Sequence, residues 1–100
     1  MTAVRVRLPQ HLRTLANVSG EVELDIGDAP TLGGVLDALE ARHPVLRGTM
    51  RDHSTRRRRP FVRFFAGEDD ISHAPADALL PADVVDGRAP LSVVGAMAGG

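Results

Sequence analysis

The chain has 100 residues, 43% of them apolar, and a formal net charge of −1. This length supports one small domain with a single core, and the near-neutral charge gives no overall attraction to nucleic acid or to an anionic membrane, so we expect neither as a partner. The absence of cysteine excludes disulfides, thiolate metal sites and cysteine nucleophiles. No stretch of the sequence is apolar enough for a signal peptide or a membrane span, and we therefore expect a cytoplasmic protein.

Two segments near the N-terminus alternate apolar and charged side chains, as strands with one buried face do. In residues 3–8 the apolar side chains stand at every second position, and in residues 22–26 they do so again. The polar stretch between them, residues 10–20, contains the turn residues Asn17, Ser19 and Gly20. The sequence therefore predicts two strands that pair as an antiparallel hairpin.

A helix is expected next, because apolar residues follow the i, i+3, i+4, i+7 spacing of one helix face at Leu32, Val35, Leu36 and Leu39. Thr31 is a suitable N-cap and Pro44 ends the pattern, with a short helical turn expected within residues 45–50. Gly33 and Gly34 are poor helix formers, and we expect that a close approach of the helix to the sheet explains them.

The second half of the chain predicts two more strands. Residues 61–65 hold all three aromatic residues and are expected to form a strand at the centre of the core, followed by turn residues at 66–70. Residues 73–90 are rich in proline, with one helical turn expected at 76–80, and residues 91–94 form the last strand. One sheet of four to five strands with one main helix on its apolar face is an α+β roll.

The histidines, at positions 11, 43, 53 and 73, have no short metal-ligand spacing, and the carboxylates near them fall in predicted turns. We therefore expect no bound metal and no acid–base catalysis. No glycine-rich loop with a following Lys-Ser or Lys-Thr precedes the helix, so nucleotide binding by this chain is not expected either.

The sequence contains four consecutive arginines, Arg56 to Arg59. Guanidinium groups in a loop can grip phosphates or an acidic partner surface. No second basic cluster or stacking aromatic extends the run, which favours a solvated connection between two elements.

The end of the sequence, GAMAGG, follows the last predicted strand and offers almost no side chain with which to pack. We expect a compact domain over residues 1–94 and a flexible tail over 95–100. A tail of small residues can thread a narrow channel in another protein, because glycine has no Cβ to collide with the walls. It would present the α-carboxylate of Gly100, which becomes reactive once adenylated. Ordinary fraying of a terminal Gly-Gly is the alternative.

The order of elements resembles the ubiquitin-like β-grasp fold, and DGRAPLSVVGAMAGG resembles the C-terminal pattern of the MoaD/ThiS family of sulfur carrier proteins. The Asp86-Gly87 turn, the strand at 91–94 and the final Gly99-Gly100 stand in the order of that pattern. VRFFAGEDDI, with Ala66-Gly67-Glu68-Asp69, is similar to the strand and turn that precede it. The chain departs from the family at Arg88-Ala89, where members often carry an acidic pair, and at Gly95-Ala96, where proline is frequent. These departures concern the choice of partner rather than the carrier chemistry.

The resemblance implies a carrier that is not itself an enzyme. A ubiquitin-activating-type enzyme would use ATP to adenylate Gly100, with Gly99 beside it, and sulfide or a persulfide would displace AMP to leave a thiocarboxylate. This sulfur would pass to a biosynthetic enzyme for cysteine, a specialised metabolite, thiamine or molybdopterin, and the chain itself would bind no cofactor. A carrier that holds sulfur on its main-chain terminus needs no thiol, which agrees with the absence of cysteine.

The sheet face opposite the helix, together with the tail, is the expected surface for these partners. Alternation places charged side chains on this face at Arg5, Arg7, Glu21, Glu23 and Asp25. We expect the contact itself to involve Arg63, Val94, Met97 and Ala98.

Three other functions remain open from the sequence. The chain could be a ubiquitin-like modifier, in which a lysine of a target protein attacks the adenylate, and it could be the small subunit of molybdopterin synthase. It could also be an interaction module whose glycine tail is incidental.

Overall fold

The computed structural model describes residues 3–27 and 30–95. Its elements are β1 (Ala3–Arg7), α1 (Gln10–Ala16), β2 (Val22–Asp25), α2 (Leu32–Arg42), the 3-10 turn η1 (Pro44–Leu46), β3 (Val62–Ala66), β4 (Asp69–Asp70), α3 (Ala82–Val85) and β5 (Leu91–Gly95). No helix in these two ranges has both the length and the apolar character needed to cross a membrane.

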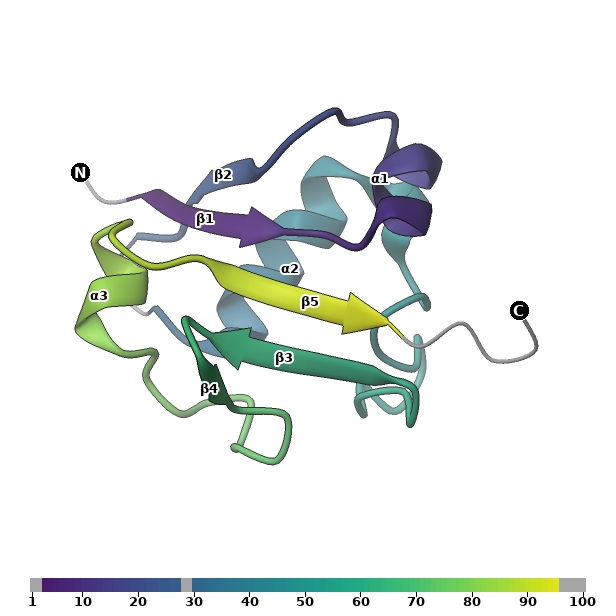
Figure 1. Ribbon diagram of the computed structural model, residues 1–100. Coiled ribbons are helices and arrows are strands. Elements are labelled where there is room, and N and C mark those ends of the chain that lie inside the picture. The colour runs from purple at the N-terminus through teal and green to yellow at the C-terminus, as the bar shows by residue number, and fades with distance from the viewer. Residues whose placement is uncertain (1–2, 28–29, 96–100) are drawn as a thin grey trace.

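The five strands form one mixed sheet in the order β2-β1-β5-β3-β4. β1 runs parallel to β5, whereas β1 with β2, β3 with β5 and β3 with β4 are antiparallel. α2 lies across one face of this sheet, and α1 and α3 lie at opposite ends of it (Figure 1). The predicted α+β roll, with a mixed sheet packed on one main helix, is confirmed.

The core lies between the sheet and α2. Alternating strand residues such as Val4 and Val6 are fully buried, and the four apolar positions predicted for the helix face are buried as well. Thr31 caps α2 as predicted, because its Oγ1 accepts a hydrogen bond from the backbone N–H of Gly34 at 2.9 Å. Helical structure resumes only in the short η1 turn, which begins at Pro44, so the predicted end of α2 is also confirmed.

The segment predicted as a polar turn contains a helix, α1. Its one buried residue is Leu12, 4% exposed, which packs into the core although its sequence neighbours are polar. The helix ends at Asn17, whose left-handed φ of 58° satisfies the predicted turn role of that residue.

Two expectations were wrong, one about the connection before β5 and one about Gly33 of α2. Residues 76–80 form no helix, because Leu79 bridges to Thr31 and the N–H of Leu80 donates to the carbonyl of Pro30 at 2.8 Å; the helical turn is α3 instead. Gly33 does face a close neighbour, but this neighbour is the connection and not the sheet. A Cβ on Gly33 would stand 3.1 Å from the carbonyl oxygen of Ala76.

The three aromatic residues were expected at the centre of the core, but only one of them is fully buried there. Phe64 is 1% exposed, Phe65 is half-buried and Phe61 is 56% exposed. Strand alternation explains the difference, because Val62 and Phe64 share the face toward α2 whereas Phe61 does not.

Candidate functional site

The structure describes the base of the predicted tail. β5 extends to Gly95, one residue past the predicted strand, whereas Met97, Ala98, Gly99 and Gly100 lie outside the described residues. β5 lies between β1 and β3: β1 pairs with its first two residues, Leu91 and Ser92, and β3 pairs along the strand as far as Gly95. The tail therefore begins where β5 is paired with β3.

The predicted Asp86-Gly87 turn delivers the chain into β5. Gly87 has a left-handed φ of +84°, and its carbonyl accepts a hydrogen bond from Nε of Arg5 at 2.8 Å. Arg88 pairs with Asp86, and this side-chain hydrogen bond lowers the pKa of the Asp86 carboxyl. The arginine at which the sequence departs from the family pattern thus closes the turn.

Two of the predicted partner-binding residues are brought together by strand register. Arg63 of β3 stands directly opposite Val94 of β5, and both are exposed on the face away from α2. Nη1 of Arg63 lies 3.2 Å from Oδ2 of Asp70, so an exposed ion pair borders this position.

Phe61 is a candidate partner-binding residue that the sequence analysis assigned to the core. It directly precedes Val62, which pairs with Gly95, so its exposed ring belongs to the end of the sheet where β5 ends. Val94 is 50% exposed. A signal for this was present in the sequence: if Val62 and Phe64 face the core, strand alternation places position 61 on the opposite face.

His11 of α1 lies against the base of the tail. A Cβ built on Gly95 would stand 3.0 Å from Cε1 of His11 and 3.7 Å from Cγ of Pro9. Because α1 was predicted as a turn, sequence reasoning did not place His11 at this site. The absence of a Cβ at Gly95 gives the histidine ring room beside β5.

Charged side chains cover the other half of the same sheet face, as predicted. Nη1 of Arg5 lies 2.9 Å from Oε1 of Glu21, and Nη2 of Arg7 lies 3.2 Å from its other carboxylate oxygen. The hydrogen bond from Arg5 is the main cause that lowers the pKa of Glu21. Glu23 and Asp25 are exposed beside this group, which makes the surface one of mixed charge.

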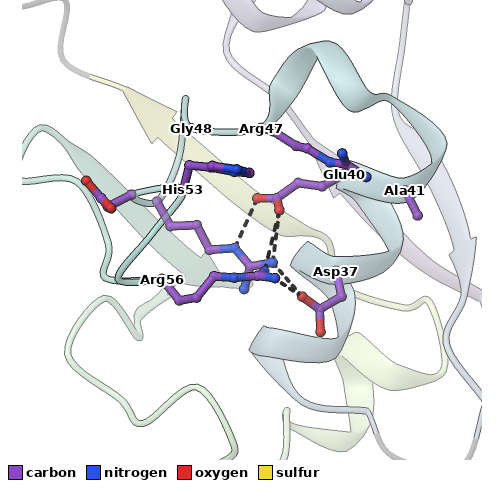
Figure 2. Close-up of a pocket in the computed structure, with 9 residues that line it drawn as sticks. Asp37, Glu40, Ala41, Arg47, Gly48, His53 and Arg56 are labelled. Carbon is purple, nitrogen blue, oxygen red and sulfur yellow. Dashed lines mark hydrogen bonds and ion pairs between the residues drawn. The ribbon is translucent and has the colours of Figure 1, made fainter.

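A buried ion pair attaches the arginine-rich loop to α2. Arg51, 6% exposed, donates from Nε and Nη2 to the two carboxylate oxygens of Glu40, each at 3.0 Å, and it also pairs with Asp37. Burial alone would lower the pKa of Arg51, but these bonds outweigh it and raise that pKa. Arg56 points toward Asp37 and Glu40 (Figure 2). Its Nη1 lies 3.2 Å from Oδ1 of Asp37.

The arginine run is a solvated connection as expected, with Arg56, Arg57 and Arg59 exposed, and hydrogen bonds also hold it against the rest of the fold. Arg58 donates to the carbonyl oxygens of Ser72 and Val62, at 3.1 and 2.8 Å, and Arg59 donates to that of Gly48 at 3.0 Å.

In the part of the chain that the structure describes, no group of three or more His, Asp or Glu side chains is arranged to hold a metal ion.

No protein-family model and no curated protein matches the sequence. Solved structures do match. Haloferax volcanii SAMP1 aligns with a TM-score of 0.75 and 20% identity over 98% of this chain and 99% of its own. A chain of the Amycolatopsis orientalis BexX/CysO complex aligns with a TM-score of 0.72 and 22% identity, over 98% and 100% of the two chains. Mycobacterium tuberculosis CysO aligns with a TM-score of 0.71 and 24% identity, over 94% and 99%.

These neighbours are small proteins of about the same length as this chain, and they are consistent with the resemblance to the MoaD/ThiS family. The chain therefore has the predicted ubiquitin-like β-grasp fold, in the form that SAMP1 and CysO also adopt.

Proposed function

We propose that the chain is a sulfur carrier whose Gly100 carboxylate is converted to a thiocarboxylate. The observation that supports this proposal is the fold likeness to SAMP1 and CysO over almost the whole length, in a sequence that places Gly99-Gly100 after the central strand. In the proposed reaction a carboxylate oxygen of Gly100 attacks the α-phosphorus of ATP and pyrophosphate leaves. Sulfide then attacks the acyl carbon and AMP leaves, which gives the thiocarboxylate directly. Where a persulfide is the donor, its outer sulfur displaces AMP to form an acyl disulfide, and a thiol of the donor protein cleaves the S–S bond, which releases the thiocarboxylate and leaves a disulfide on the donor.

The chain acts in this proposal as a co-substrate and not as an enzyme. ATP is bound by an activating enzyme of the ubiquitin-activating type, and the chain supplies the acyl group and the surface that is recognised. A cytoplasmic location follows from the need for ATP. The chain contains no cysteine, so the main-chain terminus is where sulfur would be held.

The second partner in this proposal is a biosynthetic enzyme that accepts the sulfur. CysO of Amycolatopsis orientalis was solved in a complex with BexX, which supports a stable carrier–enzyme contact for a protein of this fold. Phe61, Val94 and Arg63 lie near the base of the tail and are the described residues that we assign to the contacts with this enzyme and with the activating enzyme.

A second candidate function is protein modification, because one neighbour is named small archaeal modifier protein 1. In that reaction a lysine amine of a target protein attacks the adenylate and forms an amide with Gly100. The chain itself has no lysine, so it could not form polymers through its own side chains.

Intact-protein mass spectrometry tests the proposal. The chain is incubated with ATP, sulfide and a candidate activating enzyme, and we expect a mass increase equal to the exchange of one oxygen for sulfur, mapped to Gly100. A variant with one alanine added after Gly100 should show no exchange, whereas a control with the same alanine added at the N-terminus should react normally. Exchange in the C-terminally extended variant would contradict the proposal. Amide-linked Gly-Gly remnants on lysines of other proteins, without thiocarboxylate, would favour the modifier.

A further inference from the structure

Residues 51–59, which we call the arginine hairpin, are not used by the tail chemistry. Arg51 and Arg58 form a β-bridge at its base, and the N–H of Arg59 donates to the carbonyl of Met50 at 3.0 Å. Six of the twelve basic residues of the chain lie between positions 47 and 59, although the chain as a whole has a net charge of −1. The positive charge is therefore concentrated at one place.

The hairpin backbone is held in one conformation. Oδ1 of Asp52 accepts from the N–H groups of Ser54 and Thr55, at 2.8 and 2.9 Å, and these bonds lower the pKa of the carboxyl. The N–H of Asp52 donates to the carbonyl of Arg57 at 2.7 Å, and Arg56 takes a left-handed φ of 64°. A partner that binds here loses little entropy in ordering the loop.

Three of the five arginines in the arginine hairpin make no ion pair with a described residue. Ion pairs within the described residues reach Arg51 and Arg56, whereas Arg58 and Arg59 donate to carbonyl oxygens, which are uncharged. The side chain of Arg57 makes no hydrogen bond or ion pair to any described residue. Guanidinium groups bind carboxylates in a forked, charge-assisted geometry, so this surface is complementary to acidic side chains.

An apolar hollow of about 300 Å³ adjoins these arginines. Arg56, Arg57 and Arg58 form part of its wall together with the buried Arg51, and the remaining lining is mostly apolar: Leu32, Leu36, Phe64, Ala74 and Ala76, with Ser72. This volume is at the lower end for ligand pockets, which suits an inserted side chain better than a cofactor. The site thus offers cationic groups beside an apolar recess.

We infer that the arginine hairpin and its hollow dock an acidic segment of the protein that receives the tail. Carboxylates of this segment pair with Arg57 and its neighbours, and one apolar side chain enters the hollow. The hairpin leads into β3, whose Val62 pairs with Gly95, so it lies at the end of the sheet where the tail begins (Figure 1). The identity of the partner rests on the proposed function, whereas the chemistry of the site does not.

Acidic groups beside the hairpin favour a peptide over nucleic acid. Asp37 is exposed next to Arg56, and Asp52 is part of the hairpin turn. A continuous row of phosphates would be repelled by these carboxylates, whereas a segment with a few acidic residues can bind between them.

Fluorescence anisotropy with the full chain tests the inference. The probe is a fluorescein-labelled peptide of Glu and Asp residues around one central Leu. Arg57→Glu should weaken binding roughly tenfold or more, because it turns an attraction into a repulsion. The matched control, Arg13→Glu, makes the same change of net charge on α1 and should leave the affinity near that of the wild type. Ala74→Glu, at an exposed position of the hollow, should weaken binding independently by placing a carboxylate among the arginines.

The peptide itself provides the second comparison. Replacing its Leu by Ala should weaken binding roughly tenfold, the value of one buried apolar side chain. No binding of the Leu peptide, equal affinity for the Leu and Ala peptides, or an equal loss in Arg13→Glu would overturn the inference. Tighter binding of single-stranded oligothymidine than of the peptide would assign the site to nucleic acid instead.

The chain with an alanine added after Gly100 separates this inference from the proposed function. It should bind the peptide as the wild type does, and a loss of binding there would contradict a site distinct from the tail. Peptide binding without any thiocarboxylate would leave the docking site standing and reject the carrier. Thiocarboxylate formation without peptide binding would support the carrier and reject the docking site.

Discussion

At the scale of single residues, Gly87 decides how the chain enters its central strand. Its φ of +84° is in the left-handed region, and a Cβ at this position would stand 3.1 Å from the carbonyl oxygen of Ala3. Gly87→Ala should therefore lower the free energy of unfolding by about 1–3 kcal/mol, the usual range for such strain. Urea denaturation measures this change. Gly20→Ala is the control, since no heavy atom lies within 4 Å of its Cβ position. Equal stability of the two variants would show that the turn relaxes without cost.

At the scale of elements, the Arg51–Glu40 pair joins the arginine hairpin to α2. Both side chains are buried, so Arg51→Met leaves the Glu40 carboxylate with only a 3.9 Å contact to the exposed Arg56 and should destabilise the fold by about 3 kcal/mol, the lower end for a broken buried pair. Adding Glu40→Leu removes the stranded charge, and the double variant should recover most of this loss. Chemical denaturation of the single and double variants measures their free energies of unfolding, and the difference gives the interaction free energy between Arg51 and Glu40. A double variant no more stable than Arg51→Met would mean that the pair does not act as a unit.

At the scale of the whole molecule, the sheet face at the base of the tail is the proposed contact with the activating enzyme. Arg63 contributes an exposed cation there, and exposed ion pairs add only about 0–1 kcal/mol to stability. Arg63→Ala should therefore leave melting nearly unchanged but slow thiocarboxylate formation roughly threefold or more, through weaker association. Arg42→Ala removes an exposed cation from the end of α2, on the opposite side of the sheet, and serves as the control. An equal effect of both variants on the rate of thiocarboxylate formation would exclude this face as the contact with the activating enzyme.

Local patterns in the sequence were enough to predict much of this molecule. Period-2 alternation located β1 and β2, apolar runs located β3 and β5, apolar spacing with the Thr31 cap located α2, and Asp86-Gly87 marked the turn into β5. β4 was expected as part of a turn. Each of these signals is read from residues within one element, because side-chain direction in strands and helices depends on local backbone geometry. The pairing of Arg63 with Val94 lies outside these local signals, because it depends on β3 and β5 being neighbours in the sheet.

Only the tertiary structure decided the rest, because it depends on contacts between distant segments. Leu12 makes α1 part of the core, the carbonyl of Ala76 explains Gly33, and the carbonyls of Ser72 and Val62 hold Arg58. No local pattern contains these partners. The sequence by itself therefore determined the four longer strands, α2 and the small-residue end that suggests a carrier. The arrangement of those elements determined which side chains surround the tail and turned a run of arginines into an ordered cationic surface.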